Sequence, residues 1–296
     1  MRAHRAAVLL LLMMAGLQAG AAERSGPVHV IPVHGDIDPA LVVFVRRSIA
    51  RARDDGAAAV VFDIDTFGGR VDSALQIATL IGNLDPIDSV AWVTGGEAGT
   101  GVSWSAGALI SLSARRIFMA PGTSMGAAAP VQIGASGEPQ ASSEKEVSAV
   151  RAQMAALAEK NGYPKGLAEA MVDADVELLE AVGDGRSVLL VRDEVPAAEK
   201  RAREEGRTFE LGPVVSPPGK LLSLTAGEML RYGVSSGTVA RLGDLAGTIG
   251  AGPADLVEVE RGLADRAVAL ITGTSVTMLL ILAGLVALYL EITTPG

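Results

Sequence analysis

"SWSAGALISLSARRIFMAPGTSMGAAAP", residues 103–130, has two arginines as its only charges and sets its serines among alanine and glycine. Residues 105–114 predict a helix of small residues, and residues 115–121 predict a strand because apolar residues follow the two arginines. A glycine-rich segment then leads towards a second helix. The stretch therefore predicts part of an α/β fold in which a helix and a buried strand alternate.

The same alternation continues on both sides of this stretch. Strands that are nearly all apolar, each followed by a helix, imply a sheet covered by helices on its faces. Paired capping residues mark two helix starts, Ser143 with Glu146 and Thr225 with Glu228. The predicted strands are 28–37, 58–69, 89–95, 187–191 and 209–215, and the predicted helices are 39–55, 71–84, 144–162 and 225–237. Residues 192–207 are predicted as a solvated helix or loop.

Composition excludes several classes of function. The 296-residue chain has a net charge of −9 and no block of basic residues, so nucleic acid is not expected as a partner. It contains no cysteine, which excludes disulfides, a thiol nucleophile and cysteine metal sites. We expect no cofactor and no metal. With 49% hydrophobic but only 3% aromatic residues, the core must consist mainly of Ala, Val, Leu and Ile.

The two ends of the chain predict export and membrane attachment. Residues 1–22 have the basic, apolar and small-residue order of a signal peptide, with an uncleaved anchor as the alternative. Residues 267–290 carry no charge and as a helix would span roughly 36 Å, enough to cross a bilayer. We therefore expect an exported domain at 23–265, and a transmembrane helix with a short cytoplasmic tail at 266–296. This domain would lie on the extracytoplasmic, periplasmic side of the cell membrane.

Three features point to covalent chemistry. Gly68 and Gly69 follow a buried strand and can direct backbone N–H groups into a cleft, although an ordinary turn would look the same. Ser105 stands just ahead of a helix, whose partial positive charge favours an oxyanion, although small serines also serve in packing and capping. Lys145 lies in the first turn of its helix, where the dipole and any burial favour the neutral amine that can act as a base. A solvated surface lysine is the alternative.

The histidines do not supply an obvious base. His4 lies in the signal segment, and His29 and His34 lie on the first strand, where a structural role is expected. Ser105 with Lys145 is then the simplest pair for acyl transfer. Lys145 also heads a row of alanines, Ala149, Ala152 and Ala156, which can lie against neighbouring structure.

The segments "DTFGGRVDSA", "SAGALISLSARRIFMAPGTSMGAAAP", "SEKEVSAVRAQMAALAEKNG", "LLSLTAGEMLRYGVSSG" and "LYLEITTPG" together resemble the long form of the NfeD family. These are membrane-bound serine proteases of the ClpP class. The resemblance implies Ser105 as the nucleophile, Lys145 as the base, and Gly69 with the Ala106 amide as oxyanion donors, supported by Gly68.

The resemblance also implies a ClpP/crotonase-like spiral of β-β-α units, a homo-oligomer such as a dimer, and a stomatin-like membrane protein as partner or substrate. Two departures from the family pattern stand out. Phe67 replaces the proline that usually precedes Gly-Gly, and family members often continue beyond the final "TPG".

The leading hypothesis is a membrane-anchored Ser-Lys endopeptidase that cleaves apolar segments of membrane-associated proteins. The alternative is a non-catalytic membrane scaffold with a protease-like fold. A crotonase-like acyl-CoA enzyme shares the glycine oxyanion logic, but export from the cytoplasm and the lack of a recognisable nucleotide motif argue against it.

Overall fold

The computed structural model describes residues 26–96, 99–134, 138–272 and 274–293. The signal peptide predicted at 1–22 lies outside the described residues, as do the last three residues of the chain.

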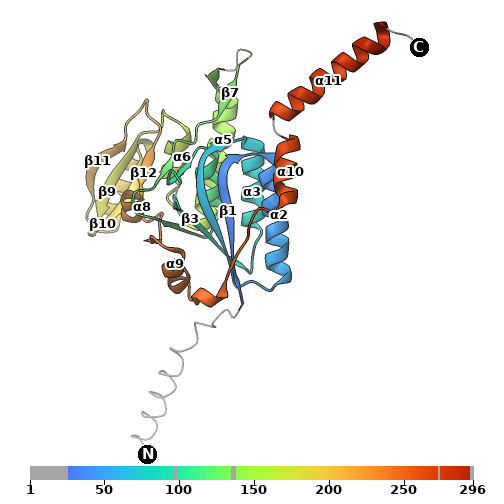
Figure 1. The fold of residues 1–296 in the computed structure, drawn as a ribbon. Helices are drawn as coiled ribbons and strands as arrows, with labels where there is room; N and C mark the ends of the chain where they lie inside the picture. Colours follow the sequence, from blue (N-terminus) through green and yellow to red (C-terminus); the bar gives the residue numbers. More distant parts are fainter. Residues whose placement is uncertain (1–25, 97–98, 135–137, 273, 294–296) are drawn as a thin grey trace, which may run out of the picture.

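A mainly parallel sheet forms the centre of the molecule (Figure 1). Strand β2 pairs in parallel with β1, β3 and β4, so these strands end at the same edge of the sheet. At one end of the sheet, β12 runs antiparallel to β6. The strands are β1 (Val28–Ile37), β2 (Ala59–Gly69), β3 (Asp88–Val93), β4 (Val102–Trp104), β5 (Arg116–Met119), β6 (Ser124–Gly126), β12 (Ser223–Thr225), β13 (Gly237–Thr238) and β14 (Leu256–Glu258). The predicted strands at 28–37, 58–69, 89–95 and 115–121 are confirmed.

Both faces of the sheet are buried for most of its length, which explains why its strands are nearly all apolar. On one face, Ile31, Phe62 and Ile64 pack with apolar residues of the covering helices. On the other face, Val61 and Val90 belong to a smaller cluster with Leu245. The helices of the first face are α2 (Pro39–Asp54), α3 (Val71–Gly82), α4 (Ala106–Ser113), α5 (Glu144–Asn161) and α6 (Lys165–Val172), and Leu245 lies on α9 (Leu242–Thr248).

The predicted caps fix the starts of two helices. Ser143 donates its backbone N–H to the Glu146 carboxylate over 2.9 Å at the start of α5. Thr225 donates in the same way to Glu228 over 2.8 Å at the start of α8 (Ala226–Arg231). Helix α8 is shorter than the predicted 225–237, because Gly233 turns the chain towards β13.

A second, three-stranded sheet lies at the left in Figure 1. It consists of β9 (Leu178–Gly183), β10 (Arg186–Val191) and β11 (Glu210–Ser216), and the charged segment between β10 and β11 forms a short 3-10 turn (Arg192–Glu194) and α7 (Val195–Glu204). Glu180 of β9 is 5% exposed and accepts hydrogen bonds from Arg231 of α8, at 2.7 and 2.8 Å, and from Ser187 at 2.7 Å. This carboxylate therefore joins the small sheet to the main body.

Smaller elements complete the description. They are a two-stranded hairpin of β7 (Val131–Ile133) and β8 (Pro139–Ala141), and a 3-10 turn (Pro253–Asp255) before β14.

Two helices follow β14 at the C-terminal end. Helix α10 (Leu263–Thr272) is held on α2 by Asp265, whose Oδ2 accepts from Arg47 at 2.6 Å. Helix α11 (Thr274–Thr293) projects from the body in Figure 1 and exposes apolar side chains such as Met278 and Leu282. Within the described ranges, no helix meets the length and apolar character required to cross a membrane. The division into 23–265 and 266–296 stays a prediction.

Removal of the Glu180–Arg231 contact tests whether it attaches the small sheet to the main body. The hydrogen bond from Ser187, followed by that from Arg231, holds the pKa of Glu180 below its ordinary value of 4.5. We expect Arg231→Ala to lower the free energy of unfolding at pH 7, since it leaves the Glu180 carboxylate with fewer donors, by an amount reduced because Arg231 is itself largely exposed. Urea unfolding followed by circular dichroism measures this.

The contribution of Glu180 to the free energy of unfolding should depend on pH. Because the folded-state pKa of Glu180 is depressed, its contribution is present above about pH 4.5 and is lost as the pH falls through the folded-state value. The difference between the wild type and Arg231→Ala should shrink in the same range. Arg241→Ala is the control, because its pair with Asp244 is exposed on both sides and should change stability little. Equal effects of the two variants at pH 7 would contradict the role of Glu180.

Candidate active site

Ser105 occupies a sharp turn between β4 and α4. Its backbone has φ 54° and ψ −121°, which lies outside the regions that L-residues ordinarily adopt. Its N–H donates to the carbonyl of Gly126 on β6 at 3.0 Å, which fixes the turn to the sheet. The side chain is half-buried and its hydroxyl forms no hydrogen bond with any described residue. A serine in a strained strand-to-helix turn at the edge of a parallel sheet is the arrangement of a nucleophile elbow.

Gly68 lies directly against this serine. A Cβ atom on Gly68 would stand 2.6 Å from the Ser105 Cβ and 2.9 Å from its Oγ, closer than carbon atoms approach. Its φ of 117° also favours glycine. The Gly68 N–H donates to Thr66 Oγ1 at 2.9 Å, so this amide is already engaged. Gly68 therefore shapes the site rather than donating to it.

The two amides predicted as oxyanion donors lie beside this contact. The Ala106 nitrogen is 3.3 Å from the position that a Gly68 Cβ would take, and as the first residue of α4 it has no intrahelical acceptor. Gly69 follows Gly68 on β2, and a Cβ there would lie 2.5 Å from the carbonyl oxygen of Ile37 on β1. The structure thus brings Gly68, Ser105 and Ala106 together and places Gly69 next to them along the strand.

Asp65 supports the loop that leads into β4. Its carboxylate accepts from the Thr100 hydroxyl at 2.8 Å and from the N–H groups of Thr100, Gly101 and Val102 at 2.9, 3.0 and 3.2 Å. Burial acts to raise the pKa of Asp65, but these hydrogen bonds outweigh it and hold the pKa below its ordinary value. Sequence reasoning pointed to the acidic residues of "DIDTFGG", Asp65 among them, only as bases to consider if Lys145 is not the base, and not as support for this loop.

Ser103 is not a competing nucleophile. It is fully buried, and its hydroxyl forms a 2.9 Å hydrogen bond with Ser111 on α4. Gly107 packs close to it, because a Cβ there would lie 3.0 Å from the Ser103 Oγ and 2.6 Å from Thr66 Cγ2. The small residues of the opening stretch therefore let α4 approach β2 and β4 closely.

Lys145 lies in the first turn of α5, as predicted, with an exposed side chain. It forms no hydrogen bond or ion pair with any residue in the described ranges, Ser105 included. The alanine row that follows it is exposed too, instead of packing against neighbouring structure, because the larger apolar residues of α5 face the core.

Helix α5 is attached to α4 at its carboxyl end. Asn161 and Tyr163 donate to the carbonyls of Leu112 and Ala114, so the carboxyl ends of α5 and α4 lie together. Helix α5 has 18 residues and α4 has 8. The ten additional residues extend α5 by about 15 Å.

A cleft lies near both residues in the sequence, although neither Ser105 nor Lys145 lines it. It has a volume of about 420 Å³ and lies between the start of α3, the β7–β8 hairpin and α5. Val71, which follows the Gly-Gly turn after one residue, lines it, and so does Glu146, the neighbour of Lys145. Most of the exposed surface of this cleft is apolar, which suits an apolar group.

The described histidines are engaged elsewhere. His29 is fully buried with its Nε2 3.1 Å from Asp55, and burial lowers its pKa. His34 is half-exposed, and its hydrogen bond to Asp63 at 3.0 Å raises its pKa. Neither contacts Ser105. Among the described residues, no group of three or more His, Cys, Asp or Glu side chains is arranged to hold a metal ion.

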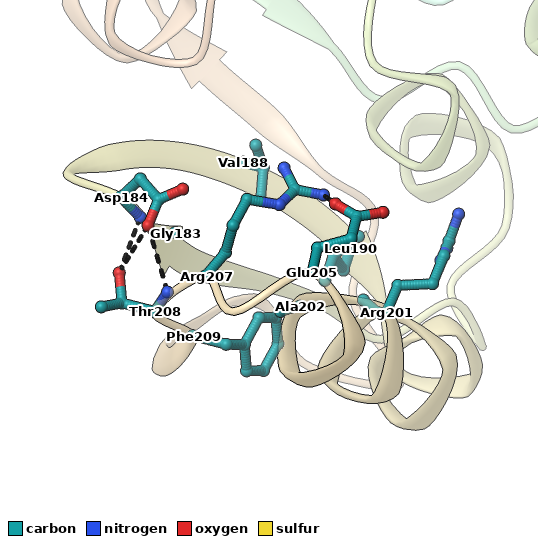
Figure 2. Close-up of a pocket in the computed structure, with 11 residues that line it drawn as sticks. Gly183, Asp184, Val188, Leu190, Arg201, Ala202, Glu205, Arg207, Thr208 and Phe209 are labelled. Carbon is teal, nitrogen blue, oxygen red and sulfur yellow. Dashed lines mark hydrogen bonds and ion pairs between the residues drawn. The ribbon is translucent and has the colours of Figure 1, made fainter.

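Another pocket, of about 390 Å³, lies in the small sheet (Figure 2). Asp184 and Thr208 hydrogen-bond to each other at one end of it, and Arg207 pairs with Glu205 near the other. This pocket lies between the β9–β10 hairpin and α7. Neither Ser105 nor Lys145 lines it, so it is separate from the candidate active site.

The fold is an α/β fold of the kind seen in ClpP-like proteases, and the strained serine lies at the carboxyl edge of its parallel sheet. The chain belongs to the NfeD1b N-terminal domain family, which it matches over residues 27–202.

Two named relatives are similar in sequence. The chain is 31% identical over its whole length to the membrane protein NfeD1b of Bacillus subtilis, of which it covers 58%. It is 31% identical over 171 residues, 56% of the chain, to the membrane-bound protease PH1510 of Pyrococcus horikoshii, of which it covers 37%. The chain therefore spans less than two thirds of the length of either relative.

Solved structures share the fold. The 1510-N membrane-bound stomatin-specific protease, in a lysine-to-alanine variant with a substrate peptide, superposes with a TM-score of 0.60 at 22% identity. That comparison covers 83% of this chain and 98% of the other. A serine-to-alanine variant of the same protease gives a TM-score of 0.57 at 21% identity, over 80% of this chain and 99% of the other.

The contact between Gly68 and Ser105 can be tested by adding one methyl group. We expect Gly68→Ala to lower the free energy of unfolding by about 2–4 kcal/mol, because the new Cβ meets the serine in addition to a strained φ. Gly122→Ala is the matched control, since Gly122 has φ 82° but nothing within 4 Å of a new Cβ. Gly122→Ala should lower the free energy of unfolding only through backbone strain, by about 1 kcal/mol. Equal losses in urea unfolding would show that Gly68 does not pack on Ser105.

Proposed function

We propose that this protein is a membrane-anchored serine endopeptidase that uses Ser105 as nucleophile and Lys145 as general base. The observation that carries the proposal is the strained turn at Ser105, which exposes its hydroxyl beside Gly68 and the free amide of Ala106. A backbone held in this way is retained where it serves chemistry. The names of the relatives, a membrane-bound protease among them, support the same class.

The proposed reaction proceeds in two balanced halves. Ser105 Oγ attacks the scissile carbonyl carbon while its proton passes to the Lys145 amine, and the N–H groups of Gly69 and Ala106 stabilise the oxyanion. The C–N bond then breaks and the leaving amine takes the proton from Lys145. Water attacks the acyl-enzyme, gives its proton to Lys145, and releases the second product with a free carboxylate. Ser105 recovers its proton from Lys145.

Closure of the site is part of the proposal, because Lys145 and Ser105 are not in contact. The apolar cleft between α3, the β7–β8 hairpin and α5 would hold the substrate, and its occupation would bring the first turn of α5 towards the serine. Catalytic hydrogen bonds often form only in the substrate complex.

The proposed substrate is an apolar segment of a membrane-associated protein. The apolar lining of the cleft supports this, and the solved relatives are named as specific for stomatin, so we propose a stomatin-like partner or substrate. We also propose that residues 267–290 anchor the chain in the cell membrane, with the catalytic domain on the extracytoplasmic, periplasmic side. The absence of charge from 267–290 and the exposed apolar side chains of α11 support the anchor. Finally, we propose that the protein forms a homodimer.

A non-catalytic scaffold is the second candidate. The exposed position of Lys145, without a described partner, is the observation that favours it. A scaffold would bind a stomatin-like protein and leave it intact at every pH, whereas the peptidase would cleave it.

Replacement of the nucleophile tests the first step. We expect Ser105→Ala to abolish cleavage of a stomatin-like membrane protein, detected by sequencing the products, while thermal unfolding changes little because one oxygen is removed. Ser103→Ala serves as the control for the neighbouring buried hydroxyl and should retain cleavage by the folded fraction. Undiminished cleavage by Ser105→Ala would exclude the mechanism.

Replacement of Lys145 tests its proposed role as the general base. Lys145→Ala should eliminate activity at every pH, and Lys145→Arg should do the same, because arginine stays protonated and cannot accept a proton. Lys200→Arg, an exposed lysine on α7, should keep the wild-type rate and pH profile. A Lys145→Arg enzyme that works at the normal rate would mean that another group is the base.

A further inference from the structure

Two exposed aromatic rings stand next to the serine. Phe67 directly precedes Gly68 on β2 and is 61% exposed, and Trp104 directly precedes Ser105 on β4 and is 36% exposed. Their ring centroids lie 5.6 Å apart with an angle of 68° between the planes. The parallel register of the two strands, which pairs Thr66 with Ser103, brings the rings side by side.

The exposure of these rings contrasts with the burial of most of the other phenylalanines and of the second tryptophan. The chain has only five phenylalanines and two tryptophans. Phe44, Phe62, Phe118 and Trp92 are all buried in the cores. Aromatic rings contribute to stability when they leave water, so an exposed pair adds little to the fold.

Trp104 is also held in a fixed orientation. Its indole N–H donates to Ser124 Oγ on β6 at 2.9 Å, which satisfies its polar group and leaves the ring as an apolar surface. The ring therefore needs no ordering before it binds a ligand, and rigid aromatic side chains of this kind are typical anchors in recognition sites.

The pair lies across the Gly-Gly turn from the apolar cleft. Phe67 directly precedes Gly68 and Gly69, and Val71, which lines the cleft, follows this pair after one residue, so both apolar surfaces adjoin the Gly-Gly turn along the chain. A peptide whose scissile bond lies at Ser105 would place neighbouring side chains on both.

We propose that Phe67 and Trp104 form a specificity subsite that holds an aromatic or branched aliphatic side chain of the peptide substrate next to the scissile bond. This inference rests on the proposed function. It commits to a substrate side chain as the occupant, because the pair is continuous in both strands with the residues that shape the site.

Peptide cleavage tests the subsite in the full-length detergent-solubilised protein. The substrates are quenched fluorescent peptides of alanine, serine and glycine with one central residue, Phe, Leu, Ala or Asp. We expect kcat/KM for the Phe and Leu peptides to exceed that for the Ala peptide by about 10- to 100-fold. Phe67→Ala and Trp104→Ala should remove most of this preference and leave the Ala peptide within about threefold of wild type. Phe209→Ala, in the distant pocket of Figure 2, should change neither value.

A binding measurement separates this proposal from the catalytic one. In Ser105→Ala, tryptophan fluorescence should change on addition of the Phe peptide, and Trp104→Phe should remove the change, because Trp92 is buried. Binding without cleavage in the wild type would overturn the proposed catalysis and keep the subsite. Equal binding of all four peptides would overturn the subsite. Fluorescence that depends on protein concentration and not on peptide would assign the rings to an interface between copies, and would also overturn it.

Discussion

The close contact between Gly68 and Ser105 is the constraint on which the site depends. With a φ of 54°, the serine adopts a strained turn, and its side chain lies so close to Gly68 that a residue with a Cβ would not fit there. The strain of such a backbone is of the order of 1–3 kcal/mol and must be offset by the surrounding structure. The bond from Ser105 to Gly126, the Asp65 carboxylate under the preceding loop and the small residues between α4 and the sheet all act at this point.

The parallel sheet explains why these groups meet. Strands β1, β2 and β4 end at the same edge, so the Gly-Gly turn, the serine and the α4 N-terminus converge there even though they are far apart in the sequence. An apolar cleft lies on the helical side of this edge and the aromatic pair lies beside it. A chain bound between them would have apolar contacts on either side of the serine, which is consistent with an apolar segment as the substrate.

Local patterns allowed much of the fold to be predicted. The strand at 28–37 has the predicted ends, and the helix predicted at 39–55 is α2, which buries Leu41, Phe44 and Ile49. The short strand β4 and helix α6 were not predicted, because three residues show no period and α6 starts without a side-chain cap. The serine and glycines were found because glycine pairs and helix starts leave local signals. The exposure of Lys145 and the contacts of Phe67 with Trp104 depend on tertiary packing, which no local pattern encodes.

The central claim is that the turn at Ser105 makes its hydroxyl a nucleophile. The most direct measurement is reaction of the folded wild-type protein with a fluorophosphonate probe, followed by mass spectrometry of the digested protein to locate the adduct. We expect one adduct, on Ser105, which is lost on heat denaturation before labelling because the turn and the amides of Gly69 and Ala106 are then no longer in place. Folded protein that takes up no probe, or that carries the adduct on a different residue, would contradict the account.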